Sequence, residues 1–583
     1  MKQFLKFTLA TIVGITIVTF IGFFLLFGII GAIAASGEST TILKPNSVYQ
    51  LDLNGILEDR SKDDSFTRAF EKAYAGSSTA TLGLDDILSN IEKAKNNSNI
   101  IGIYLKGGML SGGYASIKEI RDALIDFKET GKFVVAYADA YSQRNYYLAS
   151  AADEVLLNTI GMLDWKGIAS QTTFYKNTLE KLGIEMQIVK VGTFKSAVEP
   201  YTNTKMSDEN RHQVTTFTSS IWNEIVNAVS LSREISSENL NKYADELLIY
   251  QPVEKAVEYA LVDALVYAEQ VKDIIKLYAG GEDVNFVKHS AMTNVPNDVK
   301  YEKDRVAVIY AVGGIDMGSK DGIVSEDLVK TIQEVAENDA VKAVVFRVSS
   351  PGGSAYGSEQ IWHALQELKA KKPLIVSMGD YAASGGYYIA CGADSIFAQP
   401  NTLTGSIGVF GTIPNLKGLN EKLGFSFDGV KTNKLSDAIS INRAFTPEER
   451  NIMQSYVNRT YELFTQRCAD GREMSVEQIK AIAEGRVWTG EDALKIGLVD
   501  GLAGLPEVIR IAADKADLLS YRVVSYPEKE DFMTQLMKSF SEGVETRFLK
   551  AKFAEHYETY LQAAHFQQLN GIQARMPYEI TFN

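Results

Sequence analysis

The chain has 583 residues, too many for a single hydrophobic core, so we expect two or more domains. Hydrophobic residues make up 45% of the chain and charged residues 23%, which are the proportions of a folded globular protein. The net charge of −14, with no basic stripe in any segment, argues against a general nucleic-acid-binding protein.

The N-terminal segment departs from this soluble character. Lys2 and Lys6 precede an uncharged stretch from Phe7 to Gly37, longer than the ~20 apolar residues that a membrane-spanning helix needs. Because the positive charges come first, we expect Phe7 to about Ile30 to form one transmembrane helix with its N-terminus in the cytoplasm. The alternative is a secretory signal cleaved after Ala32-Ile33-Ala34, although the apolar core of such a signal spans only ~7–15 residues.

The rest of the chain contains a duplication. Asp153 and Asp394 end two similar apolar segments that lie 241 positions apart (394 − 153). The same offset relates further matching residues, namely Asp86 and Asp327, Gly112 and Gly353, Asp139 and Asp380, and residues 181–183 and 422–424. A constant offset over so long a stretch predicts two homologous domains.

Each copy alternates short apolar strands with helices. In the second copy we expect strands at residues 343–346, 374–378 and 395–398, and helices at residues 358–369 and from residue 386. This order predicts an α/β fold of βαβ type with a largely parallel sheet. Gly280 to Tyr301 is the expected connection between the copies, and Phe532 to Gln568 is an expected helical tail.

Ser384 lies in a turn of small residues between a predicted strand and a predicted helix. Backbone N–H groups and the helix dipole favour negative charge at such a position, so Ser384 is a candidate nucleophile. The alternative is a turn serine that only caps its helix. The first copy has Gln143 at the matching position and therefore cannot perform serine chemistry there.

Two other loops of the second copy carry candidate groups. The stretch from Ser349 to Ser354 contains two glycines, whose backbone N–H groups suit an oxyanion hole, although a plain Gly-rich turn would have the same sequence. The stretch from Leu403 to Gly411 carries Ser406, whose hydroxyl is able to orient a base. The alternative for Ser406 is an ordinary loop serine.

A serine nucleophile needs a base. His363 is the only histidine within this part of the chain, but its apolar helical neighbours favour a position at the surface or at the edge of the core. Lys195 lies among small and apolar residues, where desolvation would lower its pKa toward the neutral range that a general base requires. The second copy has Ser436 near the matching position, and the residues alone leave the choice among the lysines open. The histidines and cysteines lack metal-ligand spacing, so we expect neither a metal nor another cofactor.

Several of these stretches together resemble the signal peptide peptidase A family of Ser–Lys peptidases, in its long bacterial form. The resemblance is carried by residues 192–200, 350–354, 383–387, 403–408, 486–490 and 497–500. It covers essentially the whole chain and implies two tandem ClpP/crotonase-like repeats after an N-terminal transmembrane helix. The expected division is into a cytoplasmic stub and anchor, an N-terminal repeat, a C-terminal repeat and a helical tail, at residues 1–40, 41–290, 291–525 and 526–583.

The resemblance also assigns roles to individual residues. It implies that Ser384 is the nucleophile, Lys195 the general base and Ser406 the serine that orients the base. The backbone donor of the oxyanion hole matches Gly353 best, with Gly385 and Gly352 as further candidates. One copy would then keep the serine and the other the lysine.

The function implied by the resemblance is a membrane-anchored serine endopeptidase that degrades signal-peptide remnants released by signal peptidase. Peptide substrates, the lipid membrane and three further copies in a homotetramer are its implied partners, and nucleic acid is not among them. The catalytic body would lie on the outer, periplasmic face of the inner membrane. Two alternatives are an acyl-CoA enzyme on the same crotonase-type fold and a non-catalytic membrane scaffold. An anchor that holds the catalytic body outside the cytoplasm argues against the acyl-CoA enzyme.

Overall fold

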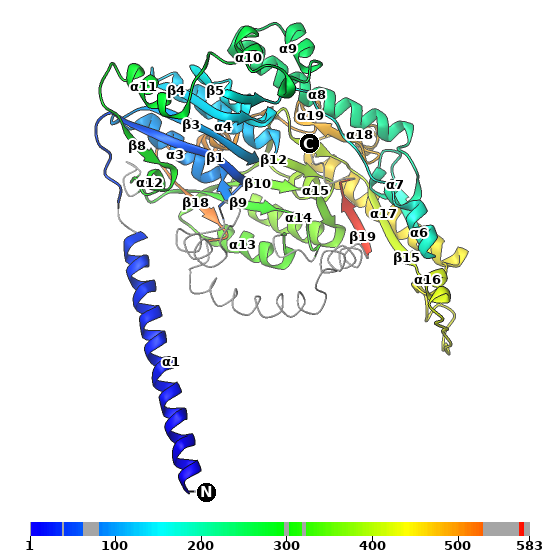
Figure 1. The fold of residues 1–583 in the computed structure, drawn as a ribbon. Coiled ribbons are helices and arrows are strands. Elements are labelled where there is room, and N and C mark those ends of the chain that lie inside the picture. Colours follow the sequence, from blue (N-terminus) through cyan, green and yellow to red (C-terminus); the bar gives the residue numbers. More distant parts are fainter. Residues whose placement is uncertain are drawn as a thin grey trace.

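The computed structural model describes residues 2–37, 40–61, 81–296, 302–317, 322–528 and 571–576 (Figure 1). Helix α1 (Lys2–Gly37) contains the segment predicted as an anchor and projects away from the body of the protein (Figure 1). Counted over the residues that the structure describes in full, no helix is both long and apolar enough to cross a membrane.

The first repeat is built on a seven-stranded sheet in the order β2-β1-β3-β4-β5-β7, with β8 also paired to β1. Every pairing in this sheet is parallel. Its strands are β1 (Ser47–Glu58), β2 (Thr81–Gly83), β3 (Ile100–Ser111), β4 (Phe133–Tyr141), β5 (Glu154–Leu163), β7 (Ala264–Leu265) and β8 (Asn285–Lys288). The helices of this repeat are α3 (Leu84–Asn96), α4 (Tyr114–Lys128), α5 (Gln143–Ala149), α6 (Lys176–Leu182), α7 (Glu199–Thr202), α8 (Asp208–Arg233), α9 (Ser237–Ala244), α10 (Glu254–Glu258), α11 (Val271–Tyr278) and α12 (His289–Thr293). Helices cover both faces of the sheet, so its central strands are apolar on both sides.

The second repeat has an eight-stranded sheet in the order β16-β14-β12-β10-β9-β18, with β13 paired to β12 and to β17. Its strands are β9 (Arg305–Val312), β10 (Val341–Ser350), β12 (Leu374–Ala383), β13 (Ser395–Ala398), β14 (Leu403–Gly405), β16 (Val487–Thr489), β17 (Gly501–Leu502) and β18 (Arg522–Tyr526). The helices are α13 (Ser325–Glu337), α14 (Ala355–Lys369), α15 (Gly385–Ala390), α16 (Lys417–Lys422), α17 (Pro447–Arg472), α18 (Val476–Ile482), α19 (Gly490–Lys495) and α20 (Leu505–Lys515). The mixed α/β architecture with largely parallel sheets is therefore as predicted.

The two repeats share one strand order, which confirms the predicted duplication. The path β8-β1-β3-β4-β5-β7 of the first repeat matches β18-β9-β10-β12-β13-β17 of the second. Matching carboxylates also make matching bonds: Asp153 accepts from the Val134 N–H and Asp394 from the Leu374 N–H, each at 2.8 Å. The main difference is that β5 is continuous, whereas its counterpart is divided into β13 and β14.

One expected assignment was wrong, and a second differs from the structure in the part of it that the structure describes. The stretch predicted as the connection between repeats contains β8 and α12, and β8 pairs with β1 as an integral strand of the first sheet. The edge of β1 offers hydrogen-bond partners that a short polar sequence does not reveal. In the expected helical tail, residues 571–575 form the strand β19 (Gly571–Arg575), and Phe532 to Gln568 lies outside the described residues.

A third sheet joins the repeats, with the antiparallel order β11-β19-β15-β6. Strand β6 (Glu185–Val191) comes from the first repeat, whereas β11 (Gly352–Ser354) and β15 (Val409–Asn415) come from the second. The β6–β15 ladder runs from Val191 opposite Val409 to Glu185 opposite Asn415. Because β6 pairs with β15, the residues that follow β6 lie against the second repeat.

A buried ion cluster also fixes the two repeats to each other. The Arg347 guanidinium, on β10, pairs with the carboxylates of Asp59 and Glu119 from the first repeat, each at 2.6 Å. Burial by itself would disfavour the charge, but the two carboxylates hold the pKa of Arg347 above its usual range. Two carboxylates thus share one guanidinium at the interface between the repeats, and burial raises the pKa of Glu119.

Candidate active site

Ser384 occupies the turn between β12 and α15, as the sequence predicted. Its backbone has φ +55° and ψ −114°, a conformation that non-glycine residues rarely adopt and that stores strain. The Ser384 N–H donates to the Gly405 carbonyl at 2.8 Å, and the Ser384 carbonyl accepts from the Tyr388 N–H at 2.8 Å. These bonds hold the strained turn and fix the direction of the serine side chain, which is fully buried.

Lys195 follows β6 and is held in place by residues from both repeats. The Phe194 N–H donates to the Glu484 carbonyl at 2.8 Å. The buried Gln213 side chain, on α8, donates from Nε2 to the Phe194 carbonyl at 3.0 Å and to Ser196 Oγ at 2.9 Å. The residues on both sides of Lys195 are thus fixed, and they hold the backbone from which its side chain extends.

The predicted trio of side chains comes together within a single chain. Lys195 Nζ lies 2.8 Å from Ser384 Oγ, 3.0 Å from the Ser406 carbonyl oxygen and 3.1 Å from Ser406 Oγ. Ser406 Oγ in turn donates to the Gly485 carbonyl at 3.3 Å. The sequence left open whether the lysine and the serine meet within one chain or between chains, and the structure joins them across the two repeats of one chain.

The environment of Lys195 favours the neutral amine. Its side chain is 0% exposed, and burial lowers its pKa well below the usual range. The described hydrogen-bond partners of Nζ are uncharged oxygens of Ser406 and Ser384. A neutral amine has two N–H groups for the two Ser406 oxygens, which leaves its lone pair for the Ser384 hydroxyl proton.

The three glycines predicted for the oxyanion hole gather beside this trio. Gly352 and Gly353 lie on β11 with φ +97° and +153°, values that favour glycine. A methyl group on Gly352 would lie 2.6 Å from the Gly385 nitrogen, so β11 passes directly against the Ser384 turn. The Gly352 N–H donates to Ser350 Oγ at 3.2 Å, which makes Gly353 and Gly385 the better candidates for donation to a substrate oxygen.

His363, the alternative base, is not part of this arrangement. Its side chain is 67% exposed on α14 and lies 3.5 Å from Glu367, whereas Ser384 is fully buried. Among the residues that the structure describes, no group of His, Cys, Asp or Glu is arranged to hold a metal ion.

Three residues that hold the lysine were missed by the sequence reasoning: Gln213, Glu484 and Gly485. Gly485 has φ +76°, and a methyl group there would lie 2.7 Å from the backbone nitrogen of Lys195. The sequence signal of these three residues is weak, because a Gln within an amphipathic helix and a Glu-Gly turn are both common. Only the position of Glu484-Gly485 directly before the resembling stretch that starts at Arg486 pointed to this region.

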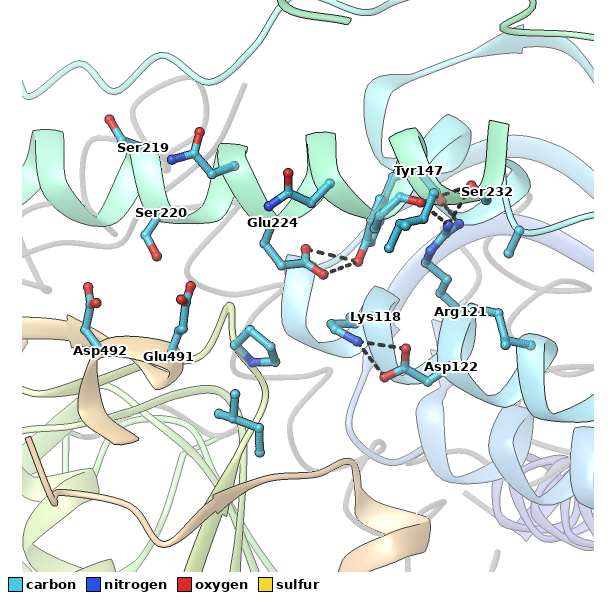
Figure 2. Close-up of a pocket in the computed structure, with 18 of the residues that line it drawn as sticks. Lys118, Arg121, Asp122, Tyr147, Ser219, Ser220, Glu224, Ser232, Glu491 and Asp492 are labelled. Atoms are coloured by element: carbon cyan, nitrogen blue, oxygen red, sulfur yellow. Dashed lines mark hydrogen bonds and ion pairs between the residues drawn. The ribbon is translucent and has the colours of Figure 1, made fainter. Parts of the chain in front are cut away.

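A surface cleft lies elsewhere, between α4, α8 and α19. It has a volume of about 1140 Å³, and its lining does not include Ser384, Lys195 or Ser406. Figure 2 shows that some of its polar side chains are paired with one another: Lys118 Nζ donates to Asp122 at 2.8 Å and the Tyr147 hydroxyl to Glu224 at 3.1 Å. This cleft lies at the surface between elements of the two repeats and is separate from the Ser384 site.

Comparisons with known proteins agree with this interpretation of the repeats. The model of Peptidase family S49 matches residues 126–280 and 366–519, once in each repeat. Protease 4 of Salmonella typhi is 34% identical over 91% of this chain and 88% of its own length. Protease 4 of Haemophilus influenzae is 33% identical over 82% and 80%, and the chloroplastic serine protease SPPA of Arabidopsis thaliana is 32% identical over 82% and 70%. A ClpP1 mutant structure from Listeria monocytogenes covers 35% of this chain and 94% of its own at 15% identity, with a TM-score of 0.24 that is too low to assign the fold. The family match in both repeats, together with relatives that span most of the chain, shows that the protein belongs to peptidase family S49.

Proposed function

We propose that this S49 serine peptidase cleaves peptides with Ser384 as the nucleophile and Lys195 as the general base. The neutral Lys195 amine takes the hydroxyl proton as Ser384 Oγ attacks the scissile carbonyl carbon. The N–H groups of Gly353 and Gly385 stabilise the oxyanion. The lysine then gives its proton to the leaving amine, and water, activated by the same amine, hydrolyses the acyl-enzyme.

One observation carries this mechanism: the 2.8 Å contact between Lys195 Nζ and Ser384 Oγ inside a fully buried site. A charged ammonium there could not accept a proton, and burial is what disfavours that charge. Ser406 contributes by occupying the two N–H groups of the amine, which turns the lone pair toward Ser384.

The test is peptidase activity on a synthetic signal peptide. Ser384→Ala and Lys195→Ala should each lower the rate by about 10⁴-fold or more, and the double variant should be no slower than either single variant. Additive losses in the double variant would contradict a joint role. Hydrolysis of an acyl-CoA thioester by the wild-type chain, without peptide cleavage, would favour the crotonase-type alternative instead.

The proposed substrates are signal-peptide remnants at the membrane, and we place the anchor at about residues 7 to 30. What supports the anchor is the uncharged run from Phe7 to Gly37 behind Lys2 and Lys6. This orientation puts the catalytic body on the periplasmic face, where remnants left by signal peptidase are within reach. Protease added to spheroplasts should digest the body, and protection of the body there would contradict the proposed side. N-terminal sequencing that finds a mature start at Ala35 or Ser36 would show a cleaved signal.

The proposed assembly is a closed ring of four copies, a number taken from the family resemblance. A head-to-tail association is supported by unused strand positions at the two ends of the repeat pair. The 241-residue offset maps β15 onto residues 168–174 and β6 onto residues 426–432, and neither stretch is a strand in the single chain. Residues 426–432 and their neighbours expose the large side chains of Phe425, Phe427 and Val430. Pairing of 426–432 with 168–174 of the next copy would repeat the β6–β15 ladder and close a ring.

A single substitution tests this assembly. Phe427→Asp should convert the ring into smaller species in analytical ultracentrifugation because it places a charge in the shared ladder. Lys190→Gln, on the exposed face of β6, is the control, because it changes the net charge by the same −1. A wild-type chain that sediments as a monomer at every concentration in detergent would rule the ring out.

A further inference from the structure

Glu199 is a buried acidic residue on the same loop as Lys195, and the mechanism does not use it. Its side chain is 4% exposed, and no cation is paired with it among the residues that the structure describes. Uncharged donors hold its carboxylate: the Ser207 hydroxyl at 2.5 Å, the Ser207 N–H at 3.2 Å and Asn210 Nδ2 at 2.8 Å. An ionised carboxylate only accepts hydrogen bonds, so Glu199 fixes the direction in which these groups point.

The Gln213 amide, on α8, has one favourable orientation because two backbone groups of opposite kind face it. The Val487 N–H donates to Gln213 Oε1 at 3.2 Å. Gln213 Nε2 donates to the Phe194 carbonyl at 3.0 Å and to Ser196 Oγ at 2.9 Å. A rotated amide would place donor against donor at Val487 and acceptor against acceptor at Phe194. In the observed orientation, Gln213 ties the loop that carries Lys195 to β16 of the second repeat.

Asn210 connects the Gln213 amide to Glu199. Asn210 Oδ1 accepts from Gln213 Nε2 at 3.2 Å, which leaves Asn210 Nδ2 to face the Glu199 carboxylate at 2.8 Å. The side chains of Glu199, Asn210 and Gln213 thus form one network, here called the Glu199 network, in which every amide has a fixed direction. All three side chains are at most 4% exposed, so the loss of one member leaves its neighbour unpaired rather than solvated.

The Glu199 network also reaches the serine that orients the base. Val487, which donates to Gln213, follows Arg486, whose carbonyl accepts from the Ser406 N–H at 2.7 Å. Gln213 is therefore bonded both to the loop that carries Lys195 and to the segment that holds Ser406. A shift of the Gln213 side chain would move the amine and its hydrogen-bond acceptors relative to each other.

We propose that Glu199 is the positioning residue of the general base, and that it acts through Asn210 and Gln213 to hold Lys195 where its amine faces Ser384. The inference rests on the proposed function, because it takes Lys195 as the base of that reaction. Glu199 acts through other side chains and not on the substrate. Its effect therefore falls on kcat and on the protonation of the amine, and leaves substrate binding unchanged.

The other charged groups packed around this loop are held by partners of their own. Glu484 accepts from the Thr193 N–H at 2.9 Å and from the Thr193 hydroxyl at 2.7 Å, and the Arg486 guanidinium lies 5.2 Å from the centre of the Phe194 ring. Burial is the cause that lowers the pKa of Lys195. A loop that loosens and admits water would therefore raise that pKa.

Breaking the Glu199 network at its middle tests the proposal. Asn210→Leu leaves Glu199 and Lys195 in place, and it should lower kcat for a peptide at pH 7 by about 10–100-fold because the amine is misplaced. KM should stay unchanged, and the pH–rate profile should move to higher pH. Glu199→Leu should behave alike, and the double variant should be no slower than the slower single variant, because the two residues act in series.

The conservative variant separates a fixed acceptor from a charge. Glu199→Gln keeps one acceptor oxygen for Asn210 Nδ2 and should retain most of the wild-type kcat. If Glu199→Gln were as slow as Glu199→Leu, the charge of the carboxylate would be what matters, and the network would be the wrong explanation.

Glu224 provides the matched control on α8. Its carboxylate is also held by uncharged donors, the Tyr147 hydroxyl at 3.1 Å and Asn401 Nδ2 at 2.9 Å, and the bond to Asn401 likewise joins the two repeats. Glu224→Leu should lower the thermal stability as Glu199→Leu does, yet leave kcat and the pH–rate profile unchanged. If Glu224→Leu moved both, general loosening of the protein would explain the result and the proposal would fail.

Two further measurements cover variants that do not fold and an enzyme that does not cleave the test peptide. Ser196→Ala removes one acceptor of Gln213 and should move the pH–rate profile in the same direction, so a profile that stays in place would count against the proposal. Proton uptake on unfolding at pH 8 needs no catalysis, and it should be smaller for Asn210→Leu than for wild type because the lysine is already partly charged in the native variant. An inactive wild type with this difference in uptake would refute the proposed function and keep the positioning role. An active wild type with the same profile and uptake as Asn210→Leu would refute the positioning role alone.

Discussion

Replacing Lys195 by Met tests the electrostatic basis of the mechanism. Methionine is an unbranched apolar side chain that fits the buried path of the lysine, which is 0% exposed. In the native wild-type chain, burial lowers the pKa of Lys195 well below its usual range. In the unfolded chain the same amine titrates near its reference pKa of ~10.4. At any pH between these two values, unfolding takes up one proton at this residue.

The sign and size of the effect follow from this linkage. Because the unfolded state binds more protons, the free energy of unfolding of the wild type rises with pH throughout this window. One proton corresponds to about 1.4 kcal/mol per pH unit. Lys195→Met lacks the titrating amine, so the stability advantage of the variant should grow by that amount for each unit by which the pH falls below ~10.4. The loss of the hydrogen bonds to Ser384 and Ser406 adds a pH-independent difference in the free energy of unfolding between the two proteins. It does not change how that difference varies with pH.

The assay is proton uptake on unfolding at pH 8, obtained from unfolding heats in two buffers of different ionisation enthalpy. Wild type should take up about one more proton than Lys195→Met. Lys190→Met, on the exposed face of β6, controls for the loss of a lysine, and a change common to both variants is subtracted. Equal uptake by wild type and Lys195→Met would mean that the buried lysine is charged in the native enzyme, which would refute its role as a base.

Three further predictions concern residues that hold the site together. Gln213→Glu removes the hydrogen-bond donors to the Lys195 loop and adds a nearby negative charge, which raises the pKa of Lys195. The pH–rate profile should therefore move to higher pH, and the rate at pH 7 should fall about tenfold for every pH unit of that movement. A profile that stays in place would leave Gln213 with a purely structural role. Gly485→Ala should lower kcat by about 100-fold because its methyl group displaces Lys195, whereas Gly131→Ala, also at positive φ but in open space, should leave kcat unchanged. Arg347→Met should lower the free energy of unfolding by about 3–5 kcal/mol in thermal unfolding, since it leaves two buried carboxylates without their positively charged partner. A smaller loss would mean that water reaches the cluster.

The duplication made much of the fold and of the site predictable from the sequence. A constant offset predicted two equivalent sheets, and the comparison of Ser384 with Gln143 and of Lys195 with Ser436 predicted that neither repeat is complete alone. The choice of Lys195 among many lysines came from a resemblance of motifs, because burial of a side chain depends on contacts that local sequence does not specify.

Other features depend on pairing between segments far apart in the chain. The sequence of residues 571–575 has no strand pattern of its own, and it forms β19 because β11 and β15 supply both hydrogen-bonding edges. The joining of lysine and serine within one chain depends likewise on the β6–β15 ladder. The strain at Ser384 arises from bonds to Gly405 and Tyr388 that hold the turn, and no local propensity predicts a positive φ for a serine.

The most direct test of the joint active site is covalent labelling of Ser384 by a fluorophosphonate, followed by mass spectrometry to locate the adduct. The account predicts an adduct on Ser384 alone, formed at a rate that increases as the pH rises through the lowered pKa of Lys195. It predicts that Lys195→Ala abolishes labelling in a folded chain. Labelling of another residue, or labelling of Ser384 in Lys195→Ala at the wild-type rate, would contradict it.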